Sequence, residues 1–310
     1  MAIELVAGQD DAGRRLDRIL RKALPDHPLS LIHRLLRQGK VLVNNRIGLP
    51  DERIQPGAII CITTVNAGLQ QVINHAKPPA PLPEILWRDH GIIIFNKPPG
   101  LATHGPHSLD TLVQAHISGG LPASLSFKPG PLHRLDRPTS GAIAFSETLD
   151  GARFFSRLLR DRAVAKTYLA ILTGSILHEE TWKNDLLRDR QKKKTFITNL
   201  AGTQNALTAI KPLACNGDCT LVQARIYTGK THQIRAQAAA HGHPLLGDRK
   251  YGGAAIRGNS QRGVFFLHAW KIEFAETPGI VALPPESFLA CVSELFGEKI
   301  KSNIINETYR

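Results

Sequence analysis

The chain has 310 residues and a mass of 34.0 kDa, with 42% hydrophobic and 21% charged residues, a balance that suits one full-sized core plus a small accessory domain. The longest clean apolar run, residues 92–95, is far too short to span a bilayer, and the N-terminus lacks a signal-peptide pattern. Lysine and arginine exceed aspartate and glutamate by 39 to 26, which favours a polyanionic partner without requiring one.

The four cysteines do not indicate a disulfide framework in a chain of this size. Cys215 and Cys219 lie four positions apart, but no second Cys or His pair follows at zinc-like spacing. We therefore expect reduced thiols, no metal site and a cytoplasmic location.

The first 66 residues are predicted to form a compact α/β unit. In residues 14–24 the leucine and isoleucine side chains recur at helical spacing, and Ser30 is a candidate N-cap for a second helix. Residues 41–43 lead into an Asn-Asn turn, and residues 57–63 have the pattern of a closing strand.

Basic residues are concentrated in this unit, with nine lysines and arginines against two acidic residues between positions 14 and 46. Such a surface is either a pair of solvated helices or a footprint for phosphates. The run from Arg15-Leu16-Asp17 through Leu29-Ser30 to Gly39-Lys40-Val41-Leu42-Val43-Asn44 resembles an S4 RNA-binding domain. The resemblance implies that RNA is contacted by Arg15, Arg18, Arg34, Arg37 and Lys40.

Residues 67–83 contain four prolines and few core-forming residues, so we interpret them as a semi-extended linker. A catalytic domain is expected over 84–296, followed by a polar, frayed tail at 297–310. Strand patterns occur at 91–95, 142–146, 167–172, 220–227 and 264–268, and helical patterns at 108–117, 148–160 and 231–241. Because they do not alternate strictly, the fold class predicted is α+β, with a mixed, mostly antiparallel sheet and a central cleft.

One loop combines several reactive residue types. The segment His133-Arg134-Leu135-Asp136-Arg137-Pro138-Thr139-Ser140-Gly141 precedes an apolar strand pattern, and such loops often carry functional groups. Neighbouring guanidinium groups help to keep a carboxylate ionised. From these residues alone, Asp136 is either a catalytic carboxylate or a structural turn cap.

Two further segments could contribute to a site. In Tyr227-Thr228-Gly229-Lys230-Thr231-His232-Gln233-Ile234-Arg235, Thr231 and Arg235 would share a helix face, and Arg235 would either reach a carboxylate or lie on the surface. Tyr168 lies in a strand pattern among many basic residues, where an aromatic ring packs in the core or stacks on a base.

Together these segments resemble the RluA-type pseudouridine synthases, and the S4-like front end is similar to the branch that acts on large-subunit ribosomal RNA. The signature His-Arg-Leu-Asp-x-x-Thr-Ser-Gly is intact at 133–141, and Lys166-Thr167-Tyr168-Leu169-Ala170 matches the tyrosine motif. Thr228-Gly229-Lys230-Thr231-His232-Gln233-Ile234-Arg235 matches the arginine motif, although Lys230 replaces the usual arginine and Gln237 a common histidine. We expect these departures to alter RNA contacts and target choice rather than catalysis.

The resemblance implies an isomerase that needs no cofactor and no metal. It implies that Asp136 is the catalytic carboxylate, that Arg235 pairs with it, and that Tyr168 stacks on the uracil and takes part in proton transfer. It also implies that Arg134 occupies the place vacated by the flipped base, that Leu267 packs on the uracil, and that Lys230 binds RNA. The sequence leaves open whether Asp136 attacks the ribose, attacks the base or removes a sugar proton.

Three other interpretations compete with a ribosomal RNA synthase. The chain would otherwise be a non-catalytic S4-type RNA-binding or ribosome-assembly protein, or a synthase acting on transfer RNA. An Asp-dependent glycosidase would need a second carboxylate opposite the first, and no motif offers one. We expect a monomer whose partner is RNA, most simply large-subunit ribosomal RNA, with no membrane association.

Overall fold

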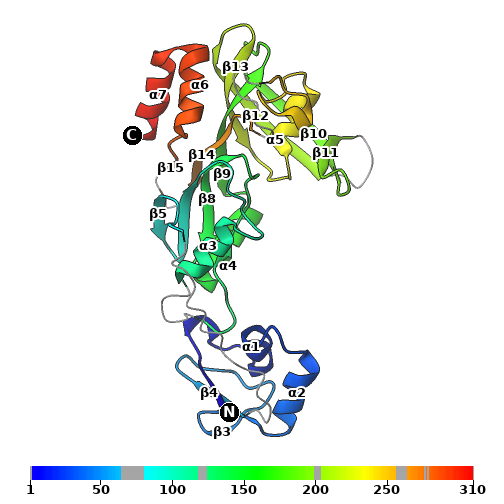
Figure 1. Ribbon diagram of the computed structural model, residues 1–310, viewed down its shortest axis with the longest axis vertical. Helices are drawn as coiled ribbons and strands as arrows, with labels where there is room; N and C mark the ends of the chain where they lie inside the picture. The colour runs from blue at the N-terminus through cyan, green and yellow to red at the C-terminus, as the bar shows by residue number, and fades with distance from the viewer. Residues whose placement is uncertain are drawn as a thin grey trace.

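The computed structural model describes residues 2–63, 80–117, 124–198, 204–255, 264–275, 277 and 279–309. Most of the predicted linker, residues 67–79, lies outside the described residues. The molecule is elongated, with the N-terminal unit at one end and helices α6 (Glu286–Phe296) and α7 (Glu298–Thr308) near the other (Figure 1). Within the described ranges, no helix is long and apolar enough to cross a membrane.

The N-terminal unit packs two helices against a small antiparallel sheet with strand order β1-β4-β2-β3. The apolar stripe of the first helix supplies Leu16, Ile19 and Leu20 to the core of this unit. The elements are β1 (Ala2–Val6), a 3₁₀ turn (Gln9–Asp11), α1 (Leu16–Ala23), α2 (Leu29–Arg37), β2 (Val41–Val43), β3 (Arg46–Ile47) and β4 (Ile59–Thr63).

The larger unit is built on one long sheet with the order β11-β10-β12-β13-β9-β14-β8-β6-β5, and two short strands pair at its side, β7 with β8 and β15 with β14. Its strands are β5 (Ile85–Asp89), β6 (Ile92–Lys97), β7 (Gly130–Pro131), β8 (Ser140–Ser146), β9 (Val164–Thr173), β10 (Glu180–Asp189), β11 (Lys194–Ile197), β12 (Gln204–Cys215), β13 (Cys219–Ile226), β14 (Leu267–Phe274) and β15 (Ile280–Val281). Its remaining helices are α3 (Leu109–Ile117), α4 (Leu149–Arg160), α5 (Gln233–Ala240) and a 3₁₀ turn (Arg249–Tyr251).

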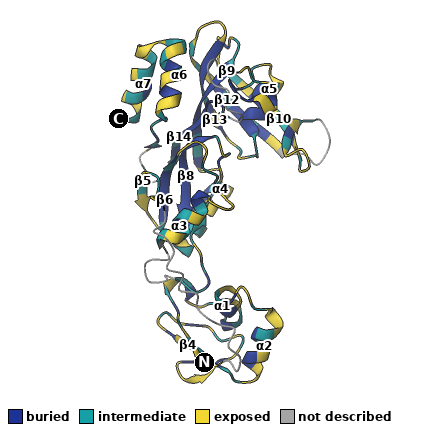
Figure 2. Cartoon of the chain, in the orientation of Figure 1, coloured by how far each residue is buried: buried dark blue, intermediate teal, exposed yellow. Residues whose placement is uncertain are grey.

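The predicted α+β class with a mostly antiparallel sheet is confirmed. Among the described strands, every pairing is antiparallel except that of β8 with β14. The central strands are buried on both faces (Figure 2). In β6, Ile93 and Phe95 face one core while Ile92 and Ile94 face another, because successive strand residues point to opposite sides. This packing explains why the strand is apolar throughout.

Several boundaries of helices and strands that were predicted from the sequence are wrong. Helix α2 begins after Pro28 rather than at the predicted cap Ser30, since the fixed φ of proline suits the residue before a helix. Helix α5 begins after His232, which has a left-handed φ of 57°, so Thr231 lies outside the helix. The strand predicted at 264–268 is instead β14, which starts at Leu267.

The C-terminal segment is not the frayed tail that was predicted. Residues Glu298–Thr308 form α7, which packs against α6. Its isoleucines recur at helical spacing and join the same core as Leu289 and Val292 of α6. Many polar residues lie between these isoleucines. The average polarity of the segment therefore gave no sign of the apolar stripe that packs the helix.

Strands β10 and β12, which extend the sheet to one side, were not predicted from the sequence. Strand β10 carries many polar residues, although Trp182 and Leu186 are buried. Strand β12 contains Pro212 at a point where the register with β13 shifts. Proline is tolerated at such irregular positions, but it lowers the strand signal in the sequence.

A buried histidine joins the ends of β8 and β14. The Ser140 hydroxyl donates to Nδ1 of His268 (2.9 Å), and Nε2–H of His268 donates to the Ala282 carbonyl (2.9 Å). This pattern uses a neutral imidazole with its proton on Nε2. Burial lowers the pKa of His268 from 6.5 to about 4 despite the Ala282 hydrogen bond.

We expect this histidine to make the fold sensitive to acid. Between pH 6.5 and 4 the unfolded chain binds a proton at His268 that the folded protein does not, so the unfolding free energy falls as the pH is lowered. The loss amounts to roughly 3 kcal/mol across that window. Chemical denaturation at a series of pH values should show a flatter profile for His268→Gln than for the exposed control His178→Gln. Equal slopes in the two variants would contradict this assignment.

Candidate active site

Asp136 lies on the loop between β7 and β8, and neighbouring backbone contacts hold this loop in place. The Thr103 hydroxyl donates to the Leu135 carbonyl (3.0 Å), and the Leu135 amide donates to the same hydroxyl (3.2 Å). Lys97 is fully buried, and its ammonium donates to carbonyls that include that of Arg137 (3.3 Å). The residues on both sides of Asp136 are therefore fixed.

The close approach of β8 to β14 brings this loop beside Leu267. Gly141 has a φ of 107°, and a Cβ atom there would lie 2.2 Å from the Ala269 carbonyl oxygen. Only glycine allows the two strands to come this close. The parallel pairing of Ala269 with Gly141 thus places the start of β14 at the pocket that Asp136 lines.

Arg235, on α5, pairs with two carboxylates at once. Its Nη1 donates to Asp136 (2.8 Å), while Nε and Nη2 donate to Asp248 (2.6 and 2.9 Å). The guanidinium carbon also lies 4.9 Å from the Tyr251 ring centre and 4.4 Å from that of Phe265. With two ring contacts and three charged hydrogen bonds, the guanidinium has one orientation, and that orientation presents Nη1 to Asp136.

His232 is a second neighbour of Asp136. Its Nε2 lies 3.7 Å from the Asp136 carboxylate, and its Nδ1 lies 2.8 Å from the Tyr251 hydroxyl, which accepts from the Thr195 amide. The Tyr251 proton therefore points to Nδ1, which leaves the imidazole proton on Nε2 towards Asp136. Burial lowers the pKa of His232 to about 4 and outweighs the opposing effect of Asp136, so the ring is neutral at pH 7.

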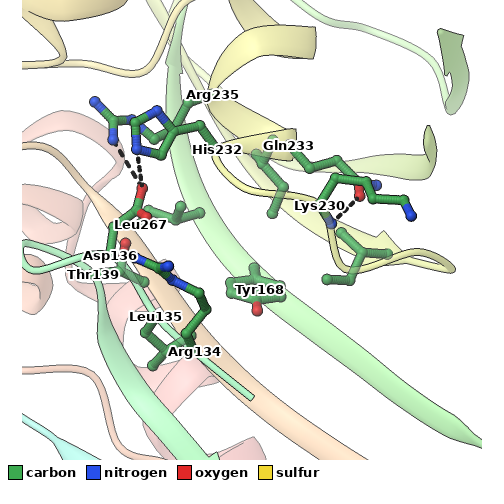
Figure 3. Close-up of a pocket in the computed structure, with 12 residues that line it drawn as sticks. Arg134, Leu135, Asp136, Thr139, Tyr168, Lys230, His232, Gln233, Arg235 and Leu267 are labelled. Carbon is green, nitrogen blue, oxygen red and sulfur yellow. Dashed lines mark hydrogen bonds and ion pairs between the residues drawn. The ribbon is translucent and has the colours of Figure 1, made fainter. Parts of the chain in front are cut away.

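Apolar and aromatic side chains complete the pocket (Figure 3). Tyr168 on β9 and Leu267 on β14 are both buried and line it, as does the exposed Arg134 at its edge. Burial and the charge of Asp136 raise the pKa of the Tyr168 hydroxyl, which stays protonated at neutral pH. Thr139 also lines the pocket, and its buried hydroxyl has no hydrogen-bond partner among the described residues.

The structure brings together six of the residues proposed from the sequence and leaves the others apart. Asp136, Arg134, Tyr168, Lys230, Arg235 and Leu267 line one pocket. Arg15 and Arg18 lie instead in a groove lined by the N-terminal unit and by Arg153 of the larger unit. Arg34 and Arg37 lie on α2 and Lys40 just after it, outside the residues that line that groove. Arg15 is partly engaged by Asp17 (2.7 Å).

Sequence reasoning did not single out Asp248, His232 or Thr139, although His232 and Thr139 lie within the quoted motifs. An aspartate directly after the apolar Leu245-Leu246-Gly247 was the available signal for a buried charge pair. Asp248 is also relevant to the glycosidase interpretation, because both its oxygens are bound to Arg235 and it is 2% exposed. It is therefore not the free second carboxylate that a glycosidase requires.

Two other features of the described residues bear on the chemistry. No group of three or more His, Cys, Asp or Glu side chains in those ranges is placed to hold a metal ion. Gln237, which replaces a common histidine, is buried, with hydrogen bonds to Thr208, Asn184 and the Trp182 carbonyl. This substitution therefore serves the packing of α5 rather than the pocket.

Each of the two units of the chain matches the model of a known protein family. Residues 91–240 match the family model described as RNA pseudouridylate synthase, and residues 14–60 match that of the S4 domain. The first match contains Asp136, Tyr168 and Arg235. The second contains α1 and α2.

Curated relatives are similar over nearly the whole chain. Ribosomal large subunit pseudouridine synthase C of Escherichia coli is 30% identical over 302 residues, covering 92% of this chain and 94% of that protein. The protein of the same description from Haemophilus influenzae is 31% identical over 285 residues, covering 87% and 86%. Among solved structures, human RNA pseudouridylate synthase domain containing 4 is 22% identical with a TM-score of 0.57, covering 68% of this chain and 92% of that one. The structural likeness concerns the fold.

Proposed function

The chain belongs to the RNA pseudouridylate synthase family, and on that premise we propose that it converts uridines of large-subunit ribosomal RNA to pseudouridine. The observation that carries the proposal is the pairing of Asp136 with Arg235 in a pocket that also contains Tyr168 and Leu267. Relatives named as large-subunit ribosomal synthases, similar over most of the chain, support this RNA as the substrate.

The reaction breaks the N1–C1′ bond of uridine and joins C5 to C1′. C5 loses a proton and N1 gains one, so no atom or electron is added overall. We propose that Asp136 is the catalytic carboxylate and that Arg235 and His232 set its orientation. The target base must leave its stack to reach this pocket, and the exposed Arg134 then fills the vacated place in the RNA.

We further propose that the uracil lies against Tyr168 and Leu267, with the Tyr168 hydroxyl taking part in proton transfer at C5. The phenol is protonated at neutral pH and lies within the same pocket as Asp136. Thr139, with its unpartnered hydroxyl, is a hydrogen-bonding group available to the ribose or the base. Lys230, at the opposite side of the pocket, is available to a phosphate (Figure 3).

The division of the chain is also part of this proposal. We assign residues 1–66 to RNA binding through the S4 domain, 67–83 to a linker and 84–296 to catalysis, with 297–310 as an appended segment. Arg15, Arg18, Arg34, Arg37 and Lys40 then contact phosphates. The protein acts as a monomer in the cytoplasm, where ribosomal RNA is processed.

The proposal is tested by mapping pseudouridine in RNA treated with the purified protein. Unmodified transcripts of large-subunit ribosomal RNA and of transfer RNAs are incubated separately, and carbodiimide adducts are located by reverse transcription. We expect a small set of modified uridines in the ribosomal transcript only. Modification confined to transfer RNA would overturn the substrate assignment, and no modification in either RNA would overturn the enzymatic one.

Removing one oxygen atom tests the role of Tyr168. Tyr168→Phe retains the ring that packs on the uracil but loses the hydroxyl, so we expect RNA affinity to be unchanged and the single-turnover rate to fall by about 10²-fold or more. Tyr227→Phe, at an exposed tyrosine, is the control. A Phe variant as fast as the unaltered enzyme would remove the hydroxyl from the proton transfer.

A further inference from the structure

The N-terminal domain contacts the catalytic domain through a buried aspartate. Asp11 is fully buried and accepts hydrogen bonds from the Ser124 hydroxyl (2.7 Å), the Leu125 amide (2.7 Å) and both the amide and hydroxyl of Ser126. The Gly8 amide of its own domain is a further donor (2.9 Å). A buried carboxylate is stable only when its oxygens are satisfied, and here most donors come from the other domain.

Two further contacts reinforce this attachment. The Leu125 side chain packs against the apolar core of the N-terminal domain, and Arg14 donates from Nη1 to the Ser126 hydroxyl (2.7 Å). Although burial opposes it, the hydrogen bonds from Ser126, Leu125, Ser124 and Gly8 lower the pKa of Asp11. The carboxylate therefore stays ionised at neutral pH. We call Asp11 and residues 124–126 the interdomain clasp.

The clasp brings basic side chains of the two domains to one concave surface. Arg14, Arg21 and Lys22 line both of two adjoining hollows, of about 750 and 630 Å³. The catalytic domain contributes Phe127 and Lys128 to the lining of the first hollow and Arg153 of α4 to the lining of the second. Among the residues that the structure describes, none of those lining either hollow is acidic. Arg153 is paired with Asp150 (3.0 Å) and Arg15 with Asp17 (2.7 Å), both beside the hollows. Arg14, Arg21 and Lys22 have no ion pair among the described residues, so the surface keeps an excess of positive charge that a polyanion would neutralise.

We propose that the two hollows form one interdomain groove that binds the sugar-phosphate backbone of the RNA substrate across both domains, with the clasp holding the two halves at a fixed spacing. The groove is defined by Arg14, Arg18, Arg21, Lys22, Lys128 and Arg153. The proposal rests on the proposed function in taking RNA as the ligand. It extends the binding surface beyond the S4 domain to α4 and to the residues after the clasp.

A fixed groove has a consequence for target choice. If the domains moved freely, a backbone segment held by the S4 domain would stand at a variable distance from Asp136. With the clasp closed, that distance is constant. The enzyme then favours uridines that lie at a set distance from the backbone held in the groove, without any reading of the bases there.

The first test alters the catalytic side of the groove. Affinity for a structured RNA hairpin is measured by fluorescence anisotropy over a series of salt concentrations for Arg153→Ala and Lys128→Ala. Each loses a phosphate contact, so we expect affinity to fall roughly 3- to 10-fold and the salt slope to decrease by about one. Arg160→Ala is the matched control, because Arg160 lies on the same helix and does not line the groove.

The second test opens the clasp. Asp11→Asn removes the charge while keeping the size, and we expect the radius of gyration measured by small-angle X-ray scattering to increase and RNA affinity to fall. Arg153→Ala should then have no further effect in the Asp11→Asn background, because the two halves no longer share one backbone. Glu4→Gln, at an exposed carboxylate of the same domain, controls for net charge.

Both tests measure RNA affinity rather than turnover, so their outcome does not depend on whether the protein is catalytically active. Should Asp11→Asn unfold the N-terminal domain, Ser126→Ala tests the same contact from the catalytic side, and the expected changes are the same in direction and smaller. If Arg153→Ala and Lys128→Ala bind as tightly and with the same salt slope as Arg160→Ala, the groove is refuted. If the clasp variants keep the original scattering profile and affinity, the clasp is refuted.

Discussion

Asp136→Asn is expected to lower the rate of pseudouridine formation by roughly 10⁴-fold or more, the scale seen when an essential group of a catalytic set is removed. The asparagine oxygen still accepts from Arg235, and Arg235 keeps its two hydrogen bonds to Asp248. The pocket should therefore keep its shape. Only the negative charge at the position facing the substrate is lost.

Release of tritium from C5-labelled uridine in RNA, under single-turnover conditions, measures this rate directly because C5 loses its hydrogen in the reaction. RNA affinity and thermal stability should stay close to those of the unaltered protein. Asp161→Asn, at an exposed carboxylate after α4, is the matched control. A rate within about tenfold of the original would exclude Asp136 as the catalytic carboxylate, since even a misplaced catalytic group costs about 10²-fold.

Asp248→Asn is expected to reduce both activity and stability. Asp248 accepts from two nitrogens of Arg235 and is 2% exposed. An asparagine amide would direct its own NH₂ group at the guanidinium, so Arg235 would turn and its hydrogen bond to Asp136 would be lost. Breaking a buried charge pair costs about 3 kcal/mol or more. We expect kcat to fall by about 10²-fold, with KM little changed.

A second variant separates positioning from folding. Adding Arg235→Leu to Asp248→Asn removes the unpaired guanidinium, so stability should partly return while activity stays low. Denaturant unfolding and tritium release measure the two properties. Asp218→Asn, at an exposed aspartate, is the control. If the double variant regained activity together with stability, Asp248 would have only a structural role.

Much of the site was predictable because its residues lie in short segments with distinctive local sequence. Asp136, Tyr168 and Arg235 were each candidates from the residues around them, the family resemblance favoured the functional interpretation, and the pocket contains all three. Helices α1 and α4 were equally clear, since their apolar residues recur at helical spacing and Thr148 caps α4 as a threonine should. The prediction of a frayed tail was wrong because the overall polarity of this segment concealed a stripe of isoleucines in α7.

The sequence by itself determined which segments line the pocket and that the region before them is basic, because motifs and charge are local properties. Only the tertiary structure decided how those segments meet. Asp136 and Arg235 are 99 positions apart, and Asp11 is 114 positions from Leu125. Such contacts depend on how the β8 and β14 strands pair and how two domains dock. The physical reason is that hydrogen bonds and ion pairs act over a few ångströms in space, whatever the separation along the chain.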